Sequence, residues 1–87
     1  MVRKILFLHG FFASGACAPA IALKEYFDGK ATVLAPDLPP HPQQALDLIQ
    51  RVCDQERPDI LVGNSNGSFL AQIAASKNNI PALLGNP

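Results

Sequence analysis

The hydrophobic positions of this 87-residue chain form short continuous runs separated by amphipathic stretches. The first run, residues 4–9, is apolar on both faces, which is typical of a strand buried in a parallel sheet. Such runs, bounded by turn residues, predict four strands, over residues 4–9, 31–35, 59–63 and 80–84. Apolar residues at helical spacing predict three helices, from residue 16 or 18 to 27, over 43–55 and over 66–77.

Strands and helices alternate along the chain, which predicts the α/β class with a parallel sheet and right-handed crossovers. On the third helix, Leu70, Ile73 and Ala74 are expected to face inward. Residues 36–42 hold four prolines and form a stiff loop after the second strand. In such sheets, ligands bind where the strands end at their carboxyl side. Candidate chemistry is therefore sought directly after each strand.

Composition narrows the possible partners of the chain. Seven basic and seven acidic side chains cancel, and no basic stripe appears, which argues against nucleic acid and anionic membranes. The apolar run near the start is too short for a signal peptide, and no run is long enough to span a membrane. Cys17 and Cys53 fit no metal or redox spacing. We therefore expect a cytoplasmic protein with reduced thiols and a single domain over residues 1–87.

The motif after the third predicted strand carries the candidate chemistry. Residues 63–67 read Gly-Asn-Ser-Asn-Gly, a G-x-S-x-G pattern between an apolar run and a helix. A serine nucleophile must project from a sharp, strained turn, and glycines at Gly63 and Gly67 avoid collisions there. The helix that follows directs its free N–H groups toward the reacting centre. The alternative is a plain glycine-rich turn in which Ser65 only caps the helix.

An acyl-transfer site also needs two N–H donors for the carbonyl oxygen. The backbone of Asn66, directly after the serine, would supply one of them. If the first and third strands are neighbours, Phe11 would supply the other, and Gly10 would let its loop approach closely. His9 ends an apolar strand, so we interpret it as a structural histidine that bonds the loop rather than as the catalytic base.

Two more polar residues lie in the stiff loop after the second strand. His41 is the only other histidine, and we interpret it as an exposed loop residue. If the second strand lies two positions from the third strand, the axes of the two strands are about 10 Å apart, which places His41 far from Ser65. A base must approach the serine hydroxyl to about 3 Å. Asp37 is similarly expected to be a turn or cap residue rather than an acid partner.

Four motifs stand in a suggestive order: Leu8-His9-Gly10-Phe11, Pro36-Asp37-Leu38-Pro39-Pro40, Gly63-x-Ser65-x-Gly67 and Gly85-Asn86-Pro87. Together they resemble the YqiA-type esterases, a small bacterial branch of the α/β-hydrolase superfamily. The resemblance covers essentially the whole chain but only about the first half of such a protein. It implies a partial α/β-hydrolase fold, a Rossmann-like three-layer arrangement, with strand order 2-1-3-4.

The resemblance also implies hydrolysis of carboxylic esters, of short acyl chains, without metal or cofactor. Ser65 would be the nucleophile, and Asn66 and Phe11 would form the oxyanion hole. The chain departs from the pattern because asparagines flank Ser65 and because Ser68 stands where such elbows often have a second glycine. More importantly, no Asp, Glu or His follows Ser65, although the superfamily places its acid and histidine there.

We therefore expect an apparently truncated hydrolase domain that is nearly inactive alone and takes a small ester as substrate. Its partners would be a complementing C-terminal segment or a second copy, paired through the edge of strand 80–84. We also expect most of the substrate pocket to lie outside these residues. Two other functions remain open, an anion- or nucleotide-binding half-domain and an assembly partner without catalysis. The absence of G-x-G-x-x-G and of a P-loop lysine argues against the nucleotide function.

Overall fold

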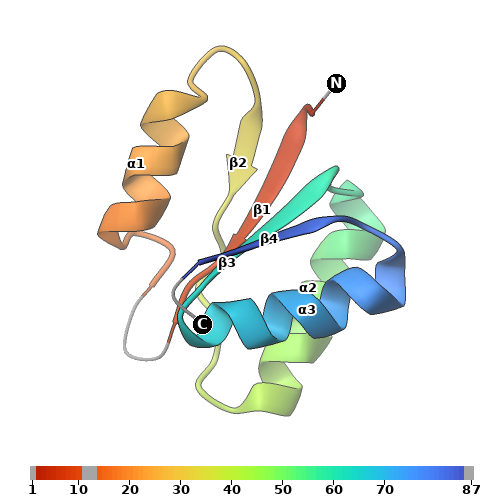
Figure 1. Ribbon diagram of the computed structural model, residues 1–87. Coiled ribbons are helices and arrows are strands. Elements are labelled where there is room, and N and C mark those ends of the chain that lie inside the picture. Colours follow the sequence, from red (N-terminus) through yellow and green to blue (C-terminus); the bar gives the residue numbers. More distant parts are fainter. Residues whose placement is uncertain (1, 11–13, 86–87) are drawn as a thin grey trace.

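The computed structural model describes residues 2–10 and 14–85, and its strands form one parallel sheet (Figure 1). The strands are β1 (Lys4–Leu8), β2 (Thr32–Leu34), β3 (Ile60–Asn64) and β4 (Ala82–Gly85). The helices are α1 (Ala18–Tyr26), α2 (Pro42–Glu56) and α3 (Asn66–Asn78). The strand order is β2-β1-β3-β4, and every neighbouring pair is parallel. The α/β fold class and the strand order implied by the resemblance are confirmed.

β1 and β3 occupy the centre of the sheet. Leu6 of β1 pairs with Leu34 of β2 on one side and with Leu61 of β3 on the other. Residues 5–8 are all buried, because strands cover both edges of β1 and helices cover its faces. This explains why the first apolar run has no polar face.

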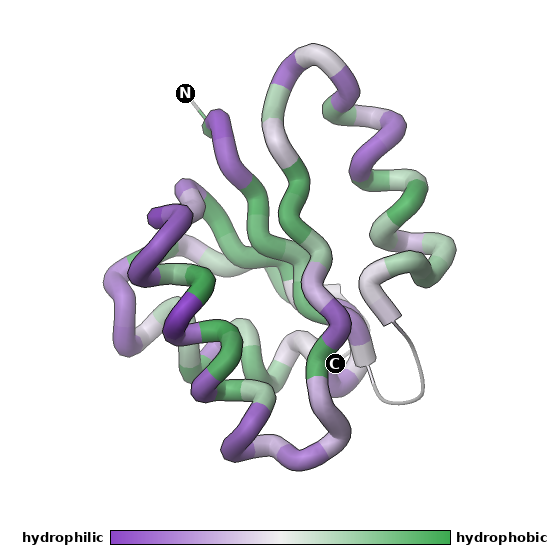
Figure 2. The backbone as a smooth tube through the Cα atoms, turned by 180° about the vertical axis from the view of Figure 1, so that it is seen from behind, coloured by the Kyte–Doolittle hydropathy of each residue, from purple (hydrophilic) through white to green (hydrophobic). Residues whose placement is uncertain are grey.

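The helices form the outer layers, with α1 on one side of the sheet and α2 and α3 on the other (Figure 1). The main core lies on the α2 and α3 side and consists of Leu6, Leu8, Ile49, Cys53, Leu61, Ala71 and Ala74. The central strands are hydrophobic, whereas α2 alternates hydrophilic and hydrophobic positions (Figure 2). None of the helices in the described part of the chain is long and apolar enough to cross a membrane.

The inner face of α3 agrees with the expectation only in part: Ala74 is in the core and Leu70 packs against it, but smaller residues are the most deeply buried. Gly67, Ser68, Ala71 and Ala74 are its buried residues, while Leu70 and Ile73 are only partly buried. Small side chains face inward because α3 packs very close to β1 and β3, where larger ones would collide. This close packing determines the position of the turn that precedes α3.

β4 begins at Ala82 rather than at the expected residue 80. Pro81 has no N–H to donate to the ladder, although its carbonyl accepts a hydrogen bond of 3.0 Å from the N–H of Leu61. No strand among the described residues pairs with the outer edge of β4, and Leu83 is 63% exposed. β4 is therefore an apolar edge strand.

The two cysteines are both unpaired and lie in different surroundings. Cys17 is the N-cap residue of α1, whereas Cys53 of α2 is part of the core. Burial, together with the nearby charge of Asp54, raises the pKa of the Cys53 thiol above its ordinary value.

Candidate active site

Ser65 lies on an abrupt turn between β3 and α3. The strand ends at Asn64 and the helix begins at Asn66, so a single residue reverses the chain. Ser65 has a φ of 57° and a ψ of −124°, a conformation that costs a residue with a side chain about 1–3 kcal/mol. Its N–H donates to the carbonyl of Gly85 at 2.9 Å, and its carbonyl accepts from the N–H of Ser68 at 3.0 Å. These two bonds hold the strained residue while its side chain stays exposed.

The glycines around Ser65 are required by close backbone approaches. A methyl group at Gly63 would collide with the carbonyl of Gly67, and one at Gly67 would collide with the carbonyl of Leu8. A methyl group at Gly10 would lie 2.9 Å from Cβ and 3.2 Å from Oγ of Ser65. The tight turn at Ser65 therefore requires glycine at Gly63 and Gly67. The close approach of the loop after β1 requires glycine at Gly10.

Ser68 is a structural residue of the site that sequence reasoning did not assign. It is 1% exposed, and its Oγ lies 3.1 Å from the carbonyl of Gly63 and 2.8 Å from that of Gly85. The hydroxyl joins the carboxyl ends of β3 and β4 beneath the turn. The available signal was a small polar residue beside Gly67 on a face otherwise made of glycine and alanine.

The backbone N–H of Asn66 is available as an anion donor. Asn66 is the first residue of α3, so its N–H has no acceptor within the helix, and the positive end of the helix dipole lies there. Phe11, the second predicted donor, lies outside the described residues. Its neighbour Gly10 is described and touches Ser65, as noted above.

His9 connects two loops at the carboxyl ends of the strands. It is 6% exposed; its Nδ1 lies 2.7 Å from the carbonyl oxygen of Gly10, and its Nε2 accepts the N–H of Leu38 at 2.8 Å. A carbonyl can only accept and an N–H can only donate, so these partners assign the proton to Nδ1. Both ring nitrogens are occupied, which leaves His9 no free lone pair to accept a proton from Ser65.

The other two polar candidates also lie in structural positions. Asp37 Oδ1 accepts the N–H of Gly15 at 2.7 Å, which ties the loop after β2 to the loop after β1. His41 is the exposed N-cap residue of α2, and its side chain makes no capping hydrogen bond. Within the described part of the chain, no hydrogen bond joins the Ser65 hydroxyl to a histidine or a carboxylate.

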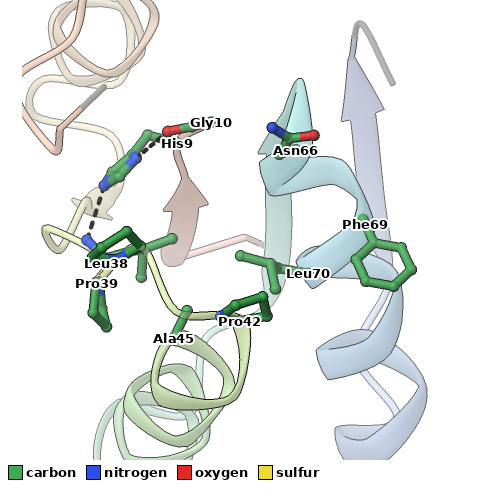
Figure 3. A pocket seen from close by; sticks show the side chains of 10 residues that line it. His9, Gly10, Leu38, Pro39, Pro42, Ala45, Asn66, Phe69 and Leu70 are labelled. Atoms are coloured by element: carbon green, nitrogen blue, oxygen red, sulfur yellow. Dashed lines mark hydrogen bonds between the residues drawn. The ribbon is translucent and has the colours of Figure 1, made fainter. Parts of the chain in front are cut away.

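A cleft of about 740 Å³ opens beside the turn (Figure 3). Its lining comes from the end of β1, the proline-rich loop, α2 and α3, and comprises His9, Gly10, Leu38, Pro39, Pro40, Pro42, Ala45, Asn66, Phe69 and Leu70. The described residues thus form a cavity beside the turn that carries Ser65. That most of the substrate pocket lies outside these residues stays a prediction. Sequence reasoning used the proline-rich loop only as a stiff connection and missed it as a wall.

A comparison with known protein families identifies the family of the chain. The family model described as "Uncharacterised protein family (UPF0227)" matches residues 4–87. The chain belongs to this family. The match supports the YqiA-type assignment made from the four motifs, because it covers the same residues.

The family assignment leaves the roles of individual residues to the geometry. In this UPF0227 chain, no group of three or more His, Cys, Asp or Glu side chains among the described residues could hold a metal ion. The polar groups found at the edge of the cleft are the hydroxyl of the exposed Ser65 and, directly after it, the backbone N–H of Asn66, which lines the cleft. These are groups that serve acyl transfer.

Proposed function

We propose that this chain carries the nucleophile and part of the oxyanion hole of a serine carboxylic ester hydrolase. The observation that carries the proposal is the exposed Ser65 in a strained turn, directly before the free N-terminus of α3. The collisions at Gly10, Gly63 and Gly67 support it, because a mere helix cap does not need three such close approaches.

The proposed reaction begins with attack of Ser65 Oγ on the carbonyl carbon of a small ester. The carbonyl oxygen becomes negatively charged and accepts a hydrogen bond from the N–H of Asn66, with Phe11 as the proposed second donor. Collapse of the tetrahedral intermediate expels the alcohol and leaves an acyl group on Ser65. Water then attacks this acyl group and releases the acid.

The serine needs a base, and residues 66–87 contain no Asp, Glu or His. His9 cannot serve because both of its ring nitrogens are occupied. A serine hydroxyl without a base is a poor nucleophile, so the 87 residues alone should hydrolyse esters very slowly. The proposed partner is a complementing segment with an acid and a histidine, which could pair with the free edge of β4. A second copy of the chain could occupy the same edge.

A substitution tests the site without needing a base. In Ser65→Cys, the thiol sits at the N-terminus of α3, which lowers its pKa and increases the thiolate fraction. A thiolate of lower pKa is also a somewhat weaker nucleophile. Lowering the thiol pKa by one unit should therefore raise the alkylation rate about threefold at neutral pH. Ser76→Cys, on the exposed part of α3, is the matched control. Iodoacetamide rates at each cysteine can be followed by peptide mass spectrometry.

Acyl transfer itself is tested with p-nitrophenyl acetate. We expect Ser65→Cys to release p-nitrophenol in a burst of about one equivalent and to carry an acetyl group on residue 65, as an acyl-enzyme does. The unsubstituted chain should not react with a fluorophosphonate probe on the same timescale. The proposed nucleophile is wrong if the cysteine of Ser65→Cys is neither alkylated nor acetylated faster than the introduced cysteine of Ser76→Cys.

A further inference from the structure

The cleft beside Ser65 is apolar and carries no ionisable side chain except His9. Three prolines, three other aliphatic side chains and Phe69 make up most of its lining. The ring nitrogens of His9 already bond Gly10 and Leu38. A charged group in this cleft would lose its water without gaining a charged partner, which is unfavourable. The cleft is therefore suited to an uncharged apolar ligand.

The cleft is also continuous with the reacting centre. Gly10 and Asn66 belong to its lining, and Gly10 packs directly against the Ser65 side chain. An ester whose carbonyl oxygen lies at the N–H of Asn66 would have one of its two chains beside this opening. The acyl chain stays bound to Ser65 through both steps, so a subsite for it acts throughout the reaction.

We propose that this cleft is an acyl-chain subsite that holds a straight, uncharged alkyl chain and that Ala45 limits the chain length. The inference rests on the proposed function, since it takes Ser65 as the point where the carbonyl is held. Ala45 is 1% exposed and lies on α2 where that helix lines the cleft, next to Pro42 and opposite Leu70 in the close-up view (Figure 3).

The walls are rigid before any ligand arrives. Pro39, Pro40 and Pro42 have fixed φ angles, so this side of the cleft loses little conformational freedom on binding. Leu38 is held by the hydrogen bond from its N–H to His9. A preformed wall should discriminate chain length sharply, because it does not adjust to a longer ligand.

Binding can be measured apart from catalysis in the full 87-residue chain carrying Ser65→Ala. Methyl butanoate, methyl hexanoate and methyl octanoate are uncharged esters. They cannot acylate this variant, because it has no hydroxyl at residue 65. Burial of a methylene contributes about 0.8 kcal/mol, so the affinity should rise roughly fourfold per methylene until the cleft is full. The measurement is the shift of backbone amide signals by nuclear magnetic resonance, which should concentrate at the cleft residues.

Substitutions in the lining test the location. Ala45→Leu should leave the affinity for methyl butanoate unchanged and remove the increase in affinity for the longer esters. Phe69→Ser changes an exposed side chain of α3, so it puts folding at less risk than Ala45→Leu does. It should lower the affinity for the longer esters severalfold. Leu83→Ser is the matched control, because Leu83 of β4 and Phe69 are both 63% exposed but Leu83 is not part of the lining.

The outcomes separate this inference from the proposed function. Affinity that does not rise with chain length, or that falls equally in Phe69→Ser and Leu83→Ser, would overturn the subsite even if Ser65→Cys is acetylated. If binding to Ser65→Ala depends on chain length but Ser65→Cys is not acetylated, the cleft binds alkyl chains and the proposed nucleophile is wrong. Octanoyl esters that acylate Ser65→Cys faster than acetyl esters would support both.

Discussion

The two ends of the sheet are held together by different kinds of contact. At the amino end, Asp59 Oδ2 accepts the N–H groups of Arg3 and Lys4 at 2.7 and 2.9 Å, and Lys4 forms an ion pair with Glu56 at 3.0 Å. Asp59 is exposed, and the side chains of Lys4 and Glu56 are 41% and 42% exposed. At the carboxyl end, neutral hydrogen bonds of His9 and Ser68 are buried, and glycines bring backbones into contact.

This difference shows where the chain tolerates change. Exposed charged contacts contribute little and weaken with salt. Buried neutral bonds and side-chain-free approaches leave unpaired groups or collisions when they are altered. The strained Ser65 lies at the carboxyl end, where backbone hydrogen bonds to Gly85 and Ser68 hold it in place. We therefore expect the effects of substitution to decrease from the carboxyl end to the amino end.

The largest effect is expected for Gly67→Ala. The added methyl group meets the backbone carbonyls of Leu8 and His9, which no rotamer change can relieve, so α3 must move away from β1. We expect a loss of about 3 kcal/mol in the free energy of unfolding, measured by urea titration, which a chain this small tolerates poorly. Gly85→Ala is the control, because its methyl group would have no neighbour closer than 3.8 Å. Equal stability of the two variants would contradict the close approach.

An intermediate effect is expected for His9→Ala. The substitution leaves the N–H of Leu38 and the carbonyl of Gly10 without partners, which costs about 2 kcal/mol. His41→Ala is the matched control, since its exposed side chain caps nothing. Urea titration gives the stability, and proton exchange at the Leu38 amide reports the lost bond. Unchanged protection of this amide would show that His9 does not hold the loop.

The smallest effect is expected at the amino end, for Asp59→Asn. The N–H groups of Arg3 and then Lys4 hold the pKa of Asp59 below its ordinary value of 3.8. A carboxylate with a lowered pKa stabilises the fold above pH 3.8 and loses this effect as the pH falls further. Asp59→Asn should therefore be less stable near neutral pH, and the difference should shrink below pH 3.8.

The control for this pH dependence is Asp28→Asn, an exposed carboxyl group without a hydrogen-bond partner in the described part of the chain. The two variants should be compared by urea titration at several pH values and constant salt. A stability difference between Asp59→Asn and the parent chain that stays the same from neutral to acid pH would show that these backbone bonds do not depend on the carboxylate.

Much of the architecture could be predicted because it is written in local patterns. Runs that are apolar on both faces identify central strands, and Pro58 marks a place where the preceding helix cannot continue. The G-x-S-x-G spacing placed Ser65 at the correct junction, because such a turn depends on neighbouring residues. The strand order came from the resemblance, since pairing between strands is not encoded in periodicity.

Contacts between distant segments could not be predicted in the same way. His9 bonds Leu38, which is 29 residues away, and Gly67 packs against the carbonyl of Leu8. The inward role of Ser68 depends on how near α3 lies to the sheet. Ala45 faces a cleft only because the proline-rich loop turns back over the end of β1.

The sequence by itself determined the order of strands and helices and the position of Ser65 between them. Tertiary structure alone decided which residues surround that serine and that a cavity opens beside it. The reason is physical. Hydrophobic periodicity constrains the backbone over a few residues, whereas the distance between a helix and a sheet results from how all the intervening side chains pack.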